Sequence, residues 1–142
     1  MTEPTAPRRM QLTGLHHVTL IVRDLSATTA FYRDTLGLAL VEQGVNEDDP
    51  AHHRHFWFGN ADGNAGTLLS FMEYTDMQPV RPGPGAAHHL ALAVDSAEEL
   101  AAWRDYLRSR AVQTTEIIQR GRFSSLYLRD PDGHIIELAT RV

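Results

Sequence analysis

The sequence has 142 residues, of which 42% are apolar and 22% are charged, and it contains no cysteine. These values are typical of one folded globular domain, and they exclude disulfides, thiolate metal sites and cysteine nucleophiles. The formal net charge of −5, without a run of basic residues, argues against a protein that binds nucleic acids or anionic membranes. Eight histidines are the unusual feature, because histidine is both a common metal ligand and a proton carrier near neutral pH.

The first residues lack any targeting pattern. Residues 1–13 contain two prolines and no apolar run, so we expect a flexible tail without a secretory leader. Nowhere does the sequence approach the roughly 20 consecutive apolar residues that a membrane helix needs. We therefore expect a cytoplasmic protein without a membrane partner.

The first half of the chain predicts a strand, a helix and three more strands. Residues 15–22 alternate in polarity and are rich in β-branched side chains, which is the pattern of a strand. Asp24 or Ser26 can cap a helix that runs to about Leu36 and ends at Gly37. The further strands are expected at 38–44, 54–59 and 66–73.

The second half predicts the same order of elements. A linker rich in proline and glycine, residues 79–85, precedes it. After a strand at 88–94, Ser96 and Glu99 form a capping box that opens a helix. The later strands are expected at 112–119, 123–129 and 134–140.

An internal repeat relates the two halves. Aligning Gly14-Leu15-His16-His17 with Ala86-Ala87-His88-His89 makes His17 and His89 equivalent, 72 residues apart. The repeat predicts one domain over 14–142, with module 1 at about 14–78 and module 2 at about 86–140. Neither module alone buries enough apolar surface to be stable, so we expect the two to pack together.

Strand alternation places the candidate functional residues on the strand faces that carry small side chains. His17 shares its face with Thr19, and His89 shares its face with Ala91, whereas bulky aliphatic residues occupy the other faces. Small neighbours leave room for a ligand. Glu137 lies in an apolar strand, where a carboxylate is costly unless it is paired or bound to a metal ion.

Two histidines and one carboxylate can form a facial triad, which leaves three positions of an octahedral ion open. His17, His89 and Glu137 are the candidate ligands. The structural alternative is a pair of satisfied core histidines and a glutamate paired with an arginine. The repeat position that matches Glu137 is Ser70, a weak ligand, and Glu73 has the opposite strand parity, so no fourth protein ligand is expected.

Three motifs resemble the vicinal oxygen chelate superfamily, which includes glyoxalase I, bleomycin and fosfomycin resistance proteins and extradiol dioxygenases. They are Leu15-His16-His17-Val18-Thr19-Leu20, Phe31-Tyr32 with Leu36-Gly37-Leu38, and Asp130-Pro131-Asp132-Gly133-His134-Ile135-Ile136-Glu137. The resemblance covers about residues 14–140. It implies an α+β fold of two paired βαβββ modules, with a curled, mostly antiparallel sheet around a metal held by His17, His89 and Glu137.

Within this superfamily the chain most resembles the hydroquinone and catechol ring-cleaving dioxygenases. The supporting segments are 45–50, 66–71 and 120–133. In that branch the positions that match His16, Thr19, Arg120 and Tyr127 surround the metal and the phenolic substrate. The resemblance therefore implies iron(II) and dioxygen, with Tyr127 or a histidine as acid or base and Arg120 stabilising an anion. Strand parity places His16 on the face opposite His17.

Other functions are compatible with the same residues. A non-redox lyase, isomerase or transferase of this fold would use manganese, zinc, nickel or cobalt and would not need oxygen. A drug-binding resistance protein would have an apolar pocket, no metal and no turnover. The ring-cleaving enzymes usually carry two such domains, so a second subunit can complete the pocket here, and the resemblance implies a homodimer. The structural alternatives are a half-buried strand aromatic for Tyr127 and a solvated strand end for Arg120.

The remaining histidines are expected to be bystanders. His52, His53 and His55 lie in an acidic loop that contains proline, and His134 belongs to the turn before the last strand. The sequence contains no nucleophile elbow, no P-loop and no dinucleotide fingerprint.

Overall fold

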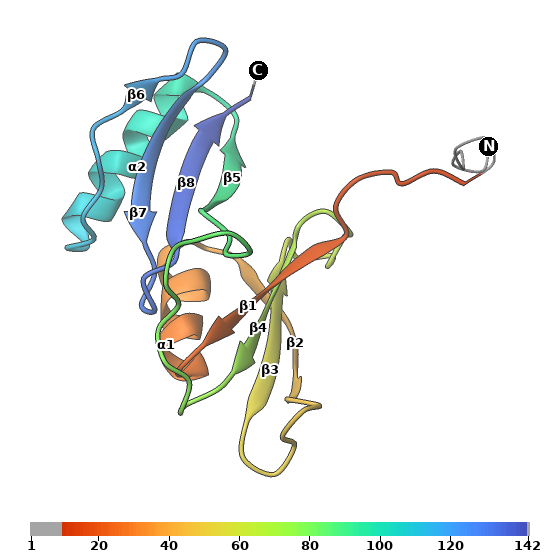
Figure 1. Cartoon of the computed structure of the whole chain (residues 1–142). Coiled ribbons are helices and arrows are strands. Elements are labelled where there is room, and N and C mark those ends of the chain that lie inside the picture. Colours follow the sequence, from red (N-terminus) through yellow and green to blue (C-terminus); the bar gives the residue numbers. More distant parts are fainter. Residues whose placement is uncertain (1–9, 142) are drawn as a thin grey trace.

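The computed structural model describes residues 10–141 as two four-stranded sheets with three helical segments (Figure 1). The first sheet contains β1 (His17–Val22), β2 (Ala39–Val45), β3 (Arg54–Gly59) and β4 (Leu68–Glu73). The second sheet contains β5 (Leu90–Val94), β6 (Ile118–Gln119), β7 (Ser124–Arg129) and β8 (Ile135–Thr140). Neither sheet is closed. Most of the tail expected at 1–13 lies outside the described residues.

The two sheets have equivalent topologies, in the orders β1-β4-β3-β2 and β5-β8-β7-β6. In each sheet the first strand pairs with the last in parallel, and the other neighbours are antiparallel. Thr19 pairs with Ser70, and Ala91 pairs with Glu137. Because Thr19 and Ala91 are equivalent in the repeat, Ser70 and Glu137 occupy the same position in their sheets. The predicted βαβββ repeat is thus confirmed.

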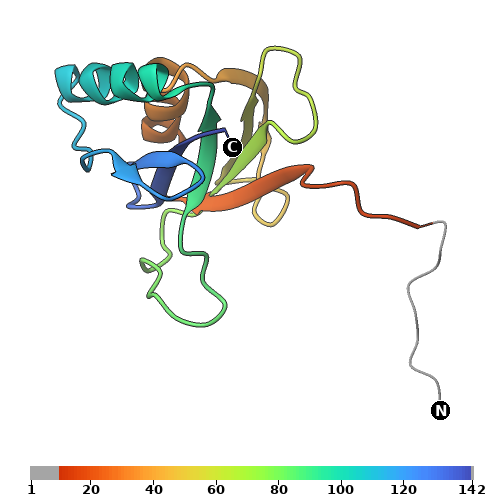
Figure 2. The same ribbon diagram turned by 90° about the horizontal axis from the view of Figure 1, so that it is seen from above.

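The helices begin where their caps predict. Helix α1 (Leu25–Thr29) continues into a π-helix, η1 (Ala30–Thr35), and α2 (Ala97–Ser109) follows β5. Asp24 accepts a hydrogen bond from the backbone N–H of Ser26, and Ser96 accepts one from that of Glu99. The helices lie on the same side of the strands (Figure 2). Across residues 10–141 no helix has the length and apolar character needed to cross a membrane.

The apolar core lies between the helices and the strand faces that turn toward them. Leu25, Leu100 and Leu107 from the helices are fully buried, as are Phe58 and Phe71 from the first sheet. Burial of each such side chain stabilises the fold by about 1.5–3 kcal/mol. The opposite faces of β1 and β5, on which the sequence places its candidate ligands, remain exposed.

A buried polar cluster joins the two halves of the chain. The Tyr32 hydroxyl donates to Asp130 Oδ2 at 2.7 Å, and Nδ1 of His134 lies 2.7 Å from the same oxygen. The backbone N–H of Arg23 donates to Asp132 Oδ1 at 2.9 Å. The turn that contains His134 therefore forms a structural junction between the halves.

Two elements differ from the sequence prediction. The strand expected at 112–119 is reduced to β6, because Arg108 holds the preceding segment by donating to Thr114 Oγ1 and to the carbonyl of Thr115. The helix expected to reach Leu36 changes type, because the Leu36 N–H bonds to the carbonyl of Phe31, five residues back. This spacing defines a π-helix, which periodicity alone does not distinguish from an α-helix.

Candidate functional site

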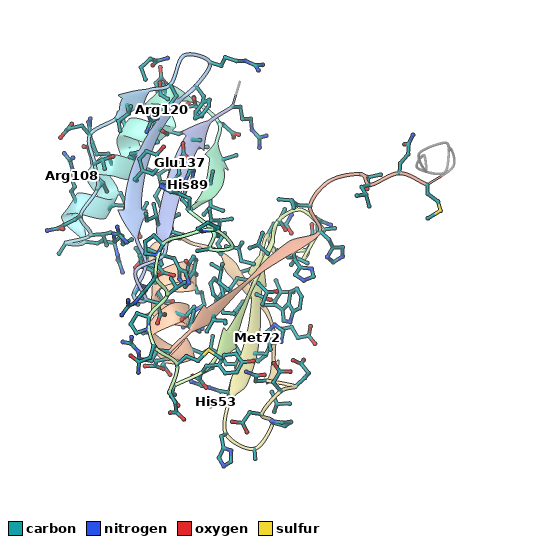
Figure 3. All side chains as sticks on the ribbon, viewed as in Figure 1. His53, Met72, His89, Arg108, Arg120 and Glu137 are labelled. Carbon is teal, nitrogen blue, oxygen red and sulfur yellow. The ribbon has the colours of Figure 1, made fainter. Side chains whose placement is uncertain are left out.

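His89 and Glu137 face each other in the second sheet (Figure 3). Nε2 of His89 lies 2.8 Å from Oε1 of Glu137. Glu137 is only 4% exposed, whereas 32% of the His89 side chain is open to solvent. The neighbour of Glu137 on the β5 side is Ala91, so only a methyl group stands beside the carboxylate on that side. An imidazole nitrogen and a carboxylate oxygen that converge in this way can bind a divalent cation.

The same histidine doublet stands where the first strand of each sheet begins, with His17 opening β1 and His89 directly before β5. The Nδ1 atoms of His88 and His89 are 2.8 Å apart, and those of His16 and His17 are 3.0 Å apart. In each pair one ring nitrogen donates and the other accepts, so Nδ1 is engaged. Nε2 of His17 and Nε2 of His89 are therefore the nitrogens left for a ligand.

His16 contacts His17 although strand alternation predicted that it would face away. Strand β1 begins at His17, so alternation does not govern the residue before it. The duplicated doublet is the sequence signal that could have indicated both contacts, including that of His88, which sequence reasoning left outside the site.

His17 lies at the start of β1, in the first sheet, with an exposed side chain. Its ring meets the ring of Trp57 edge-on, with centroids 4.8 Å apart. Within residues 10–141, no three side chains of the metal-binding types converge on one point. One chain therefore brings together His89 and Glu137, while His17 stands on the open face of the other sheet.

Tyr127 and Arg120 extend the site along the second sheet. Tyr127 pairs with Glu137 across β7 and β8, and its ring meets the His89 ring edge-on at 5.7 Å. Arg120 Nη2 donates to the Tyr127 hydroxyl oxygen at 3.0 Å. The guanidinium places positive charge beside this hydroxyl, where an oxygen anion would be stabilised.

In the first sheet a pair of hydroxyl groups occupies the position that matches the carboxylate. Oγ1 of Thr19 lies 2.6 Å from Oγ of Ser70, which is fully buried. Glu73 faces the other side of the sheet, as predicted, and accepts hydrogen bonds from the Leu25 N–H and from Arg54. Burial opposes the ionisation of Glu73, but these hydrogen bonds outweigh it and hold its pKa below the usual range. Glu73 therefore does not join Thr19 and Ser70 on the open face.

A groove of about 990 Å³ opens beside His89. Phe31 of η1 and Val112 supply apolar walls, while Tyr127 and Arg120 supply the polar groups. A concave, mostly apolar groove with a few convergent polar groups suits a small organic ligand. The arginine favours a ligand that carries an oxygen anion.

The loop histidines have two different environments. His52 and His53 both pair with Asp49 (Figure 3 labels His53, which lies directly before β3 and away from His89). His55, in contrast, lies inside β3 and is 8% exposed, so the prediction of a solvated loop residue is wrong for it. Its ring stacks on Trp57, with centroids 5.2 Å apart. Alternation along β3, which puts His55 and Trp57 on one face, could have indicated this contact.

Comparison with known proteins identifies relatives over almost the whole chain. The family model described as the Glyoxalase/Bleomycin resistance protein/Dioxygenase superfamily matches residues 14–138. MhqA of Bacillus subtilis (strain 168), named as a candidate ring-cleaving dioxygenase, is 30% identical over 129 residues, which are 91% of this chain and 40% of MhqA. The fosfomycin resistance protein FosX of Listeria monocytogenes is 27% identical over 129 residues, which are 89% of each chain.

A comparison with solved structures identifies a similar relative. A solved structure described as a candidate dioxygenase from Bacillus subtilis superposes with a TM-score of 0.82 at 34% sequence identity. The match covers 90% of this chain and 40% of that one. The chain thus spans about two fifths of the length of these two relatives, which are named as candidate dioxygenases.

Proposed function

The chain belongs to the glyoxalase/bleomycin resistance protein/dioxygenase superfamily, and we propose that it is an iron(II)-dependent enzyme that cleaves the ring of a small catechol or hydroquinone. The observation that carries this proposal is the pair of His89 and Glu137, with Nε2 and Oε1 2.8 Å apart, beside Tyr127 and its partner Arg120. The relatives named as ring-cleaving dioxygenases support the reaction class.

The residues present fit a divalent cation. Across residues 10–141, the buried Glu137 carboxylate has no lysine or arginine within ion-pairing distance, and its partner is His89. A metal ion would compensate this buried charge, and its ligands would be His89, Glu137 and His17. When bound, iron(II) supplies the redox chemistry that lets dioxygen react with an aromatic ring.

The neighbouring residues would bind the substrate and move its proton. The Tyr127 hydroxyl would exchange a proton with the substrate phenol, and Arg120 would stabilise the resulting oxygen anion. His16 and His88 would keep the Nδ1 atoms of the two ligand histidines engaged. Thr19, bonded to Ser70, would line the other side of the site.

We place the third ligand, His17, in a second copy of the chain. Strands β1 and β5 are the edge strands of their sheets, and the faces that carry His17 and His89 are exposed. Ile21, on the same face of β1 as His17, is 50% exposed, so this edge strand presents an apolar side chain that a second copy can cover. If β1 of one copy faces β5 of the other, a twofold dimer joins His17 to His89 and Glu137 twice.

A non-redox metal enzyme of the same fold is the second candidate. FosX is similar over 89% of its own length, whereas the match to MhqA covers only 40% of that protein. In this case the same ligands would hold manganese, zinc, nickel or cobalt as a Lewis acid, and turnover would not consume oxygen.

Metal analysis combined with oxygen uptake tests the proposal. Protein purified without chelators is analysed for metal, loaded anaerobically with iron(II), and mixed with catechols and hydroquinones in an oxygen electrode. We expect stoichiometric metal and substrate-dependent oxygen uptake, and both should be lost in His89→Ala and Glu137→Ala. His52→Ala, an exposed histidine paired with Asp49, is the matched control and should change neither.

The outcomes separate the alternatives. Absence of stoichiometric metal from the wild type contradicts both enzyme proposals and favours a drug-binding protein. Stoichiometric metal with turnover that does not consume oxygen contradicts ring cleavage and favours the non-redox enzyme.

A further inference from the structure

A row of aromatic side chains crosses the open face of the first sheet and ends at His17. Trp57 lies between two histidine rings: it stacks on His55 at 5.2 Å and meets His17 edge-on at 4.8 Å. Trp57 belongs to β3 and His17 to β1, with β4 between them. The residue of β4 that pairs with Trp57 is Ser70, and its small side chain lets the indole reach across the strand to His17.

The second sheet repeats this arrangement with Tyr127. Trp57 pairs with Ser70 just as Tyr127 pairs with Glu137, and each aromatic ring meets the second histidine of its doublet edge-on. Trp57 is therefore the counterpart of Tyr127 in the repeat, but it lacks a hydroxyl group. What the two rings share is their contact with a ligand histidine.

His55 packs against the indole ring of Trp57. It is 8% exposed, and its Nδ1 lies 3.1 Å from Oε2 of Glu47. Its Nε2 is buried without a partner among the described residues, which costs least when that nitrogen carries a lone pair and Nδ1 carries the hydrogen. Nδ1 therefore donates to Glu47, and the ring lies as a fixed flat surface against Trp57.

We propose that Trp57 is a positioning residue that holds the His17 imidazole in its metal-binding orientation, with Nε2 free and Nδ1 bonded to His16. The inference rests on the proposed function, in which His17 is a metal ligand. A ring that is held by Trp57 and at Nδ1 by His16 has lost most of its rotational freedom before a metal arrives, so binding costs less entropy.

Cobalt(II) titration of the full-length protein tests the inference. The chain has two tryptophans, so Trp103→Phe leaves Trp57 as the only tryptophan reporter. We expect cobalt to quench its fluorescence with the same midpoint as the rise of cobalt absorbance. Trp57→Ala should weaken cobalt binding about tenfold to hundredfold, as loss of a residue that orients a ligand does. Trp57→Phe, which keeps an aromatic ring, should recover most of the affinity.

Trp103→Ala is the matched control, because it removes the tryptophan of α2 and should leave cobalt affinity unchanged. Thermal unfolding of the metal-free variants accompanies each titration, and Trp57→Leu replaces Trp57→Ala if the latter does not fold. Wild-type affinity in Trp57→Ala or Trp57→Leu overturns this inference alone. Cobalt binding that leaves Trp57 unquenched overturns it together with the assignment of His17 as a ligand. A wild-type protein that binds no cobalt overturns the proposed metal site together with it.

Discussion

The Tyr32 hydroxyl donates a 2.7 Å hydrogen bond to Asp130 and so ties η1 of the first half to the hairpin of β7 and β8 in the second. Burial, together with the negative charge of Asp130, raises the pKa of Tyr32, so its hydroxyl remains a donor. His134 contacts the same carboxylate oxygen at 2.7 Å. This junction helps to hold the two halves of one chain in the arrangement that keeps His17 apart from His89.

The junction predicts how stability depends on pH. The hydrogen bond and charge of Asp130 raise the pKa of His134 against the effect of burial. The contribution of His134 to the free energy of unfolding is complete below its unfolded pKa of about 6.5. It is lost as the pH rises through the raised pKa of the folded state. Burial opposes the ionisation of Asp130, but the bonds from His134 and Tyr32 lower its pKa. The contribution of Asp130 to the free energy of unfolding is present above its unfolded pKa of about 3.9. It is lost as the pH falls through the lowered pKa of the folded state.

Urea denaturation between pH 3 and 9 should therefore show a maximum on the acid side of neutrality. His134→Gln should flatten the decline on the alkaline side, because glutamine does not titrate. His52→Gln, at an exposed histidine, should show the same alkaline decline in stability as the wild type. An unchanged alkaline slope in His134→Gln would show that His134 does not carry this dependence.

Tyr32→Phe should destabilise the chain by about 1–3 kcal/mol, because Asp130 remains buried after it loses a donor. Tyr106→Phe is the control: its hydroxyl donates to the carbonyl of Thr35 at 2.8 Å, but the residue is 37% exposed. Water can replace that hydrogen bond, so its loss should cost less. Equal unfolding free energies for the two variants would contradict the importance of the buried junction.

Much of the fold could be predicted from local patterns. Alternation predicts β3 at its observed residues, and the repeat relates Ser70 to Glu137, in agreement with their strand registers. The strand expected at 112–119 was overestimated, because Arg108 binds the Thr115 carbonyl and the Tyr127 N–H of β7 bonds to the Thr115 side chain instead. Such a contact depends on tertiary structure and leaves no periodic signal.

Only part of the candidate site could be predicted from strand alternation. Parity selects the face on which His17, His89 and Glu137 lie, because it is a property of each strand. Strand parity does not determine the relative placement of the two sheets, which depends on contacts such as that between Tyr32 and Asp130. The separation of His17 from the other two could therefore not be predicted.

The placement of His17 in a second copy predicts complementation between inactive variants. His17→Ala and His89→Ala should each be inactive alone. If subunits exchange freely, half of the dimers in an equal mixture are mixed, and each mixed dimer keeps one complete site of two. Oxygen uptake should then recover to about one quarter of the wild-type value.

The control for this experiment is a mixture of His89→Ala with Glu137→Ala, which lack ligands from the same half-site. Every dimer in that mixture has two defective sites, so no activity should return. Inactivity of the His17→Ala and His89→Ala mixture, with mixed dimers demonstrated by mass spectrometry, would place all three ligands within one chain.

Tyr127→Phe should lower turnover about 10²–10⁴-fold while leaving metal content unchanged, since the hydroxyl transfers a proton but does not hold the metal. The edge-on contact of the ring with His89 is retained by phenylalanine. Tyr106→Phe, at a residue that does not line the groove, should keep wild-type turnover. Metal loss in Tyr127→Phe would instead assign the residue a role in holding His89.

Ser70→Glu should convert the proposed three-ligand site into a four-ligand site. Ser70 and Glu137 occupy equivalent positions in their sheets, so the new carboxylate would project onto the face that carries His17. The added carboxylate should increase zinc affinity and fill a position that dioxygen needs, so oxygen uptake should disappear.

In the absence of metal, the new charge at a fully buried position should destabilise Ser70→Glu, and zinc should restore its melting temperature. Ser70→Ala is the control, because it removes only the hydroxyl bonded to Thr19 and should leave metal binding and oxygen uptake intact. Oxygen uptake at the wild-type rate in Ser70→Glu would mean that residue 70 does not face the metal. The assignment of His17, two residues from Thr19 on the same face, would then be wrong as well.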